Sequence, residues 1–238
     1  MGRIRIFAGP NGSGKTTLNS ELKGQYNLGY YINADDLFQK VKEEHTFDFS
    51  VYNLTPSFSS VKAFASRHGL FPKLPFGLSF VLHGSQAIFP GPPNVYEMAI
   101  ITDYLRHSLL ELGETFTFET VFSHPAKISF INKANKKGYR TYLYFVSTNS
   151  PEINIERVKQ RVEEGGHAVP EAKIRSRYKR SLENLLPAMK QAYRTYVFDN
   201  SGKSCKLLAQ VTPGKNLTID SVHIPLWFEE YVLKHILD

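Results

Sequence analysis

The first seventeen residues contain the feature that most constrains the fold. Residues 3–8 read R-I-R-I-F-A and predict a short strand, and Gly9-Pro10-Asn11-Gly12-Ser13-Gly14-Lys15-Thr16 follows directly. A G-x-x-x-x-G-K-T pattern between a strand and a helix, expected here over 15–24, predicts a phosphate-binding loop. The backbone N–H groups of such a loop bind phosphate, while its lysine adds a positive charge. We therefore expect residues 9–16 and Thr17 to bind ATP, with Lys15 at the β- and γ-phosphates and Thr16 as a Mg²⁺ ligand.

Composition limits the classes of protein that remain. The chain has 238 residues, enough for one α/β domain, and it contains no run of about 18 apolar residues that would predict a membrane span. It starts with a strand rather than a basic-then-apolar leader, and Cys205 is the only cysteine, which excludes an internal disulfide and a Cys/His metal cluster. We therefore expect a cytoplasmic enzyme.

The net charge of +7 suits two kinds of partner, nucleic acid or a small anionic substrate together with ATP. The positive surplus is concentrated between Lys127 and Lys190, on segments that read as helices, and does not form a basic tail. This distribution favours a small anion, so nucleic acid is the less favoured partner.

Alternating elements predict the fold. Strands are expected at 30–33, 115–121, 139–147, 195–198 and 207–211, and helices at 37–44, 95–113, 123–137, 151–162 and 225–237. This order predicts a P-loop NTPase-type parallel sheet covered by helices on both faces, in a single domain over residues 1–238.

Residues 45–94 do not follow that alternation. The stretch is rich in Phe, Pro, Gly and Ser, with one short helix expected after Thr55-Pro56. Its many aromatic residues argue against disorder, so we expect an insertion at about 45–94 that packs onto the core. A cover over the substrate, a subunit contact and a decoration without a role all remain open.

A second charged segment predicts a lid. The helix over 151–162 carries Arg157 and Arg161, Gly165-Gly166 interrupts it, and a second helix starting at Val169-Pro170 carries Arg177 and Arg180. Arginines on both arms of a helical hairpin, here at about 151–184, are typical of a lid that neutralises charge during phosphoryl transfer. The alternative is a solvated helical face.

Phosphoryl transfer to an alcohol also needs a base beside the acceptor oxygen. Asp35 and Asp36 follow the strand at 30–33, and Glu119 lies near the end of the strand at 115–121. Asp35 and Glu119 are therefore candidates for that base. The alternatives are a helix N-cap for one of the two aspartates and a solvent-facing strand position for Glu119.

Some weaker candidates have simpler explanations. Ser123 and His124 precede an expected helix and suit helix capping, and His167 suits a hinge.

Several of these motifs occur together in one family. The set consists of Gly9–Thr16, Asn33-Ala34-Asp35-Asp36-Leu37, Phe118-Glu119-Thr120, G-Y-R-T-Y-L-Y-F-V at 138–146, R-V-K-Q-R-V at 157–162, G-G-H-A-V-P at 165–170, R-Y-K-R-S at 177–181 and Asp199-Asn200-Ser201. In this order the motifs resemble the zeta toxin family over most of the chain, with 45–94 outside the match. Members of that family are ATP-dependent kinases that phosphorylate the 3′-hydroxyl of UDP-N-acetylglucosamine and are held inactive by a small antitoxin.

The resemblance implies roles for individual residues. Asp35 matches the family's catalytic base and Glu119 its substrate-side glutamate, with Asp36, Thr120 and His167 expected on the substrate side. For the lid, Arg177 and Arg180 both fit the later arginine. The earlier position is filled by Arg161 or replaced by His167.

The predicted function is therefore an ATP- and Mg²⁺-dependent small-molecule kinase. Its acceptor is expected to be the hydroxyl of a UDP-sugar such as UDP-N-acetylglucosamine, with a toxin role and an antitoxin partner as further expectations. The alternatives are a kinase acting on an antibiotic, a nucleoside or a polynucleotide end, and a nucleotide-binding regulatory module without transferase activity.

Overall fold

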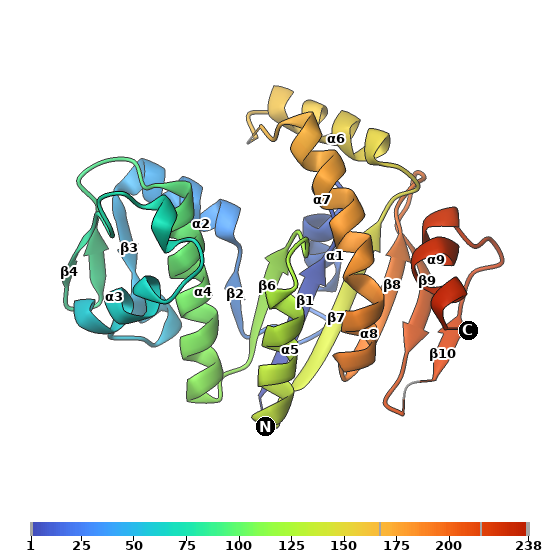
Figure 1. The fold of residues 1–238 in the computed structure, drawn as a ribbon, viewed down its shortest axis with the longest axis horizontal. Coiled ribbons are helices and arrows are strands. Elements are labelled where there is room, and N and C mark those ends of the chain that lie inside the picture. Colours follow the sequence, from blue (N-terminus) through green and yellow to red (C-terminus); the bar gives the residue numbers. More distant parts are fainter. Residues whose placement is uncertain (1, 167, 215, 237–238) are drawn as a thin grey trace. The chain divides into compact units, whose positions relative to one another are not determined.

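The computed structural model describes residues 2–166, 168–214 and 216–236, which form two compact units (Figure 1). The first unit contains Met1–Leu28 and Thr117–Asp238, and the second contains Gly29–Phe116. Within these described ranges, no helix is both long and apolar enough to cross a membrane. The two units are described separately below.

The first unit is built on a mostly parallel sheet. Its strands are β1 (Arg3–Ala8), β6 (Phe116–Thr120), β7 (Arg140–Ser147), β8 (Arg194–Asp199), β9 (Lys206–Val211) and β10 (Leu217–Ile219), and they run in the order β10-β9-β8-β7-β1-β6. β7 pairs in parallel with both β1 and β8, whereas β9 is antiparallel to β8 and to β10. The expected α/β class is confirmed, but the expectation of an all-parallel sheet is wrong at this edge. The connections into β9 and β10 are shorter than the crossover of a dozen or more residues that parallel neighbours need.

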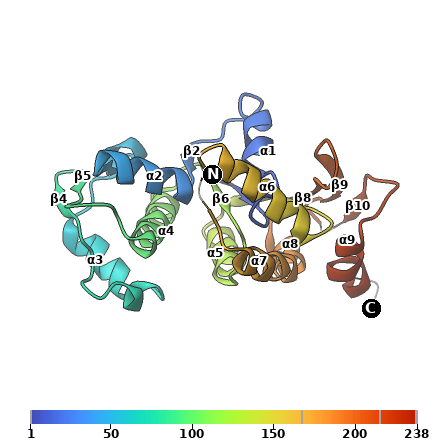
Figure 2. The ribbon, with the colours of Figure 1, turned by 90° about the horizontal axis from the view of Figure 1, so that it is seen from above.

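Helices cover both faces of this sheet. The helices of this unit are α1 (Lys15–Leu22), α5 (Ala126–Lys136), α6 (Pro151–Glu163), α7 (Glu171–Glu183), α8 (Leu185–Gln191) and α9 (Leu226–Tyr231), followed by the 3₁₀ turn η3 (Leu233–His235). Figure 2 shows α1 on one side of the strands and α5 and α8 on the other. Ile4, Ile6 and Phe7 of β1 are fully buried, as expected for a strand covered on both faces.

One predicted helix ends where expected and another ends earlier. The second arm of the hairpin expected at about 151–184 is α7, which ends at Glu183 and is followed by α8, where Pro187 has no N–H with which to continue the ladder. The C-terminal helix expected over 225–237 stops at Tyr231, where Val232 leaves helical geometry with φ −127° and ψ −63°.

The second unit contains most of the unexpected structure. Its elements are β2 (Tyr30–Ile32), α2 (Ala34–Glu44), β3 (Thr46–Asp48), η1 (Phe49–Tyr52), α3 (Phe58–Ser66), η2 (Phe71–Lys73), β4 (Val81–His83), β5 (Gln86–Ile88) and α4 (Val95–Leu112). The predicted insertion at 45–94 lies entirely within this unit. It contains the expected short helix, α3, and also an antiparallel sheet in the order β3-β5-β4 that the sequence did not indicate. Strands of three residues are too short to show a two-residue alternation.

Five of the aromatic residues of 45–94 are buried and belong to a core, namely Phe47, Phe49, Tyr52, Phe80 and Phe89, whereas Phe58 and Phe76 are exposed. Phe49, Phe80 and Phe89 are each at most 3% exposed, and the Phe47 and Phe49 rings meet edge to face at 4.8 Å between centroids. Burial of these rings explains why a stretch rich in Pro and Gly is ordered.

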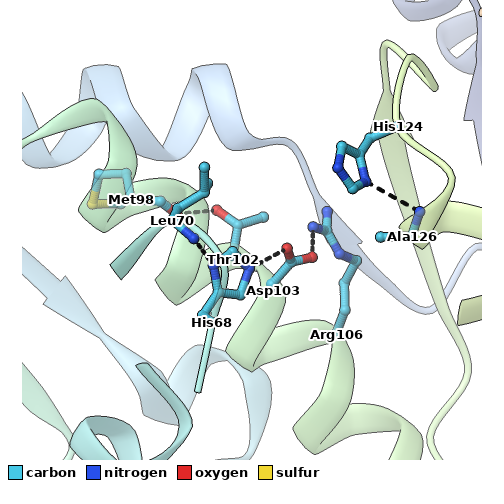
Figure 3. Close-up of polar contacts among 8 residues, drawn as sticks. All are labelled: His68, Leu70, Met98, Thr102, Asp103, Arg106, His124 and Ala126. Atoms are coloured by element: carbon cyan, nitrogen blue, oxygen red, sulfur yellow. Dashed lines mark hydrogen bonds and ion pairs between the residues drawn. The ribbon is translucent and has the colours of Figure 1, made fainter. Parts of the chain in front are cut away.

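A polar network holds α4 to the segment after α3 (Figure 3). His68 Nε2 lies 3.0 Å from Asp103 Oδ2, and Arg106 forms an ion pair with the same carboxylate. The Leu70 N–H donates to His68 Nδ1 at 3.1 Å. Because Nδ1 accepts, the proton of the neutral ring is on Nε2, where it donates to Asp103.

Candidate active site

The glycine loop has the strand–loop–helix geometry that the sequence predicts. It leaves β1 at Gly9 (φ 139°), turns at Gly12 (φ 74°) and enters α1 after Gly14 (φ 98°). A Cβ at Gly9 would lie 2.0 Å from the Val146 carbonyl oxygen, and one at Gly14 would lie 2.3 Å from Asn200 Nδ2. Both the positive φ angles and the lack of space therefore require glycine.

Three side chains hold the loop by donating to its carbonyl oxygens. Lys15 Nζ donates to the Pro10 oxygen at 2.8 Å, and Asn200 Nδ2 donates to the Ser13 oxygen at 2.8 Å. Asn154 of α6, which is fully buried, donates to the Asn11 oxygen. The sequence did not indicate the role of either asparagine. Asn200 was visible only as part of Asp199-Asn200-Ser201, and Asn154 only as a polar residue in an amphipathic helix.

Glu119 lies beside the start of α1. Its Oε2 accepts a hydrogen bond from Thr16 Oγ1 at 2.8 Å, and its Oε1 accepts one from Asn19 Nδ2 at 3.5 Å. The side chain is only 8% exposed, so the solvent-facing alternative is wrong. A buried carboxylate in contact with the loop threonine is a structural relationship that the sequence did not indicate.

Thr17 was also expected to bind ATP. It lies in the first turn of α1, directly after Thr16, and it is exposed, whereas the next residue, Leu18, is buried in the core. The position at the start of the helix that follows the loop agrees with the expectation. A contact between Thr17 and ATP stays a prediction.

The oxygens of Thr16 and Glu119 fit a Mg²⁺ ion. Mg²⁺ prefers oxygen ligands and is usually held by one or two carboxylates together with substrate phosphates, rather than by a cage made of protein alone. In the part of the chain that the structure describes, no group of three or more His, Cys, Asp or Glu side chains is arranged to hold a metal. The donor set therefore suits a metal that arrives with a nucleotide.

The predicted lid segment is a helical hairpin. Ile155 and Val158 of α6 pack against Ile174 of α7, and Lys159 pairs with Glu171 across the arms at 3.1 Å. A second cross-arm pair joins Arg175 to Glu152, and its hydrogen bond lowers the Glu152 pKa to about 2. Figure 1 shows the hairpin beyond the carboxyl ends of the parallel strands of its unit, the end at which β1 enters the glycine loop.

The three candidate arginines lie in different surroundings. Arg177 is half-buried, and its Nη1 donates to Asn11 Oδ1 of the glycine loop at 3.3 Å. Arg180 is exposed and donates to the Ser176 oxygen of its own helix. Arg161 lies in the last turn of α6, where its carbonyl oxygen accepts from the Gly166 N–H. Of the two candidates for the later lid arginine, Arg177 contacts the loop.

Asp35 and Asp36 lie in the second unit, in the first turn of α2. The Asn33 side chain accepts from the Asp35 N–H at 3.0 Å, so Asn33 is the N-cap of this helix. The alternative that one of the two aspartates is the N-cap is therefore wrong, and their chemical roles stay predictions.

Other candidates make local contacts. Thr120 Oγ1 accepts from the Phe122 N–H at 3.2 Å, within the turn that follows β6. His124 Nδ1 accepts from the Ala126 N–H at 3.2 Å just before α5 (Figure 3), but the N-cap of that helix is Pro125 and no described side chain caps it. His167 lies outside the described residues.

Comparison with known proteins gives one family match. The model of the zeta toxin family matches residues 96–211, which include Glu119 and both arms of the hairpin but not the glycine loop. An uncharacterized protein of Haemophilus influenzae is 33% identical over 74 residues, which amount to 31% of this chain. The matched stretch spans only about half, 53%, of that protein.

Solved structures share the fold. A structure of AvrRxo1-ORF1:AvrRxo1-ORF2 with sulphate ions is similar with a TM-score of 0.60 and 14% identity, over 93% of this chain and 62% of that chain. The AvrRxo1-ORF1:-ORF2 structure with ATP has a TM-score of 0.59 and 16% identity, over 92% and 61%. A structure from the PezAT toxin-antitoxin system of Streptococcus pneumoniae has a TM-score of 0.48 and 16% identity, over 86% and 69%.

These findings bear on the resemblance predicted from the sequence motifs. The fold similarity to AvrRxo1 extends over nearly the whole chain, although this chain spans less than two thirds of the AvrRxo1 chain. The family match is independent of the glycine loop, which many ATPases share. The resemblance to the zeta toxin family is therefore confirmed, and residues 96–211 carry that family's sequence pattern.

Proposed function

We propose that this chain is an ATP-dependent kinase that transfers the γ-phosphoryl group to a hydroxyl of a small molecule. The observation that carries the proposal is the hydrogen bond from Thr16 to the buried Glu119 beside a complete glycine loop. This arrangement provides a phosphate cradle and a carboxylate–hydroxyl pair suited to a bound metal. An ATP complex of the similar AvrRxo1 structure agrees with ATP as the phosphoryl donor.

The residues of the first unit have separate roles in binding the triphosphate. Lys15 supplies a positive charge to the β- and γ-phosphates, and Thr16 and Glu119 provide the oxygens for Mg²⁺, with Thr17 beside them at the phosphates. A metal held by Thr16 and Glu119 would neutralise charge that develops on the phosphate oxygens. Arg177 supplies further positive charge from the hairpin. We expect Arg161 and Arg180 to assist it.

On the acceptor side, Asp35 takes the proton of the attacking hydroxyl. We expect the acceptor to be a UDP-sugar such as UDP-N-acetylglucosamine, with Asp36, Thr120 and His167 contacting it. The family match supports this class of acceptor. Toxicity controlled by an antitoxin protein belongs to the same proposal, and the similar AvrRxo1-ORF1 structures contain a second protein, AvrRxo1-ORF2.

The test is a search for the phosphorylated product. The protein is incubated with ATP, Mg²⁺ and either UDP-N-acetylglucosamine or a metabolite extract, and products heavier by one phosphoryl group are sought by mass spectrometry. Asp35→Ala should abolish the product while ATP binding, measured by calorimetry, is kept. Glu43→Ala, at an exposed position near the other end of α2, is the matched control and should behave as wild type.

Two outcomes would contradict parts of the proposal. Full activity of Asp35→Ala would exclude Asp35 as the base. Release of inorganic phosphate without any phosphorylated product would indicate a nucleotide-binding regulatory module instead of a kinase.

A further inference from the structure

Both arms of the hairpin contact the same residue of the glycine loop, Asn11. Asn154 of α6 donates to the main-chain oxygen of Asn11, and Arg177 of α7 donates to its side-chain Oδ1 at 3.3 Å. Asn11 is only 7% exposed. It is therefore a buried junction between the phosphate-binding loop and the predicted lid.

The base of the hairpin is attached firmly elsewhere in the unit. Tyr178 donates through its hydroxyl to the Thr148 oxygen at 2.6 Å, and Asn184 Nδ2 donates to the Phe122 oxygen at 2.9 Å. Ser181 donates to the Val121 oxygen in the same region. These bonds hold the C-terminal half of α7, so Arg177 lies just beyond the anchored part of the helix.

The N-terminal part of α7 is attached mainly to α6. Ile174 packs against Ile155 and Val158, and the two cross-arm ion pairs described above join the same arms. The N-terminal part of α7 is therefore supported by its packing on α6 and by the contact of Arg177 with Asn11.

A phosphate could replace Asn11 as the hydrogen-bond acceptor of Arg177. The contact between Arg177 and Asn11 joins a charged guanidinium to a neutral amide oxygen, and its length of 3.3 Å lies beyond the usual range of N–H···O hydrogen bonds. A phosphate offers the guanidinium an opposite charge and often two parallel hydrogen bonds, whereas the amide offers one neutral oxygen. A triphosphate in the loop would therefore outcompete the amide for the guanidinium.

We propose that Asn11 is a positioning residue that holds Arg177 at the loop until ATP binds and then releases the guanidinium to the triphosphate. The hairpin is thus kept close to the loop without nucleotide, and nucleotide binding exchanges one acceptor of Arg177 for a better one. A neutral acceptor suits this task, because a carboxylate at the same position would bind the arginine more strongly and repel phosphate. The proposal rests on the proposed function, since it requires ATP to bind in the loop.

Hydrogen exchange of α7, followed by mass spectrometry with and without ATP and Mg²⁺, tests the proposal. In nucleotide-free Asn11→Ala, amides of residues 171–177 should exchange about tenfold faster than in wild type, because one hydrogen bond to a charged group is lost. Adding ATP and Mg²⁺ should return this exchange to the wild-type rate, because the triphosphate replaces the missing acceptor. In Arg177→Ala, exchange should be fast both without and with nucleotide.

A conservative variant and a control complete the design. Asn11→Asp keeps the shape of the side chain and should weaken ATP binding by about tenfold or more, with no faster exchange in α7. Lys179→Ala removes an exposed positive charge from the same helix and should match wild type in both measurements. Circular dichroism melts of each variant show whether it folds.

The outcomes separate this proposal from the proposed function. If wild type does not bind ATP, both are overturned. If wild type binds ATP but α7 of Asn11→Ala exchanges as in wild type without nucleotide, or stays fast when ATP is bound, the role of Asn11 is wrong and the kinase proposal stands.

Discussion

Thr16 Oγ1 donates a hydrogen bond of 2.8 Å to Glu119 Oε2, which joins the first turn of α1 to the end of β6 across 103 residues of sequence. The bond uses the only proton of the hydroxyl, so the lone pairs of the threonine oxygen remain for another partner. Glu119 was expected on the acceptor side of the site. Because Glu119 contacts Thr16, it would also lie beside the proposed metal. Its role on the acceptor side stays a prediction.

Removing the charge of Glu119 tests this position. Glu119→Gln keeps the size of the side chain and an oxygen that accepts from Thr16, so the melting temperature should change little. Loss of the negative charge should raise the Mg²⁺ concentration needed for half-maximal turnover by about 10- to 100-fold. Initial rates measured against Mg²⁺ at fixed ATP check this, and an unchanged Mg²⁺ dependence would exclude Glu119 from the metal site.

Alanine substitutions at two glycines with positive φ distinguish the effect of backbone strain from the effect of lack of space. Gly9 and Gly24 have φ angles of 139° and 103°, so a side chain at either position is strained by about 1–3 kcal/mol. A Cβ at Gly9 would meet the Val146 carbonyl oxygen at 2.0 Å, whereas nothing lies within 4 Å of one at Gly24. Gly9→Ala should therefore lose ATP binding and melt at a clearly lower temperature than Gly24→Ala.

Calorimetry with ATP and thermal melts of both glycine variants check this comparison. Gly24→Ala serves as the control and should bind ATP as wild type does. Equal ATP affinity in the two variants would show that the space at Gly9 is not required.

A buried carboxylate stabilises the second unit. Glu97 is 1% exposed and accepts from the N–H of Ser79 at 2.6 Å and from its hydroxyl at 2.8 Å. Ser79→Ala removes the second donor from a buried charge and should lower the free energy of unfolding by about 1–3 kcal/mol. Ser66→Ala is the control, because that hydroxyl is exposed and bonds to the Ala63 oxygen of its own helix. Equal urea midpoints for the two variants would contradict the role given to Ser79.

Tyr144 makes stability depend on pH in the alkaline range. Burial raises its pKa from 10.0 to about 12, and the nearby positive charge of Arg5 opposes that shift in part. The unfolded chain loses the phenol proton at lower pH than the folded chain does. This contribution to stability is therefore complete below pH 10 and is lost as the pH rises from 10 towards 12.

The measurement for Tyr144 compares urea midpoints at about pH 9 and about pH 11.5. Wild type should lose more stability over this interval than Tyr144→Phe, which has no phenol proton to release. Identical losses in the two proteins would show that Tyr144 does not titrate differently in the folded state.

Most elements of the first unit could be predicted because their signals are local. Strand β1, the glycine loop and the hairpin α6–α7 follow from apolar spacing, glycines and charges that lie close together in sequence. The antiparallel edge β8-β9-β10 could not be predicted in the same way, because a strand shows its length and burial in its sequence but not the direction of its neighbour. The sheet β3-β5-β4 was missed because its strands are shorter than the pattern that reveals a strand.

The same distinction between local sequence signals and long-range contacts applies to the candidate site. The sequence alone determined the loop at 9–16, since its chemistry depends on neighbouring residues in a fixed order. Only the tertiary structure decided that Glu119 contacts Thr16, that Asn154 and Asn200 hold the loop carbonyls, and that Arg177 rather than Arg180 contacts Asn11. These partners are separated by about a hundred residues or more, and which side chains meet depends on how strands and helices pack, which no local pattern encodes.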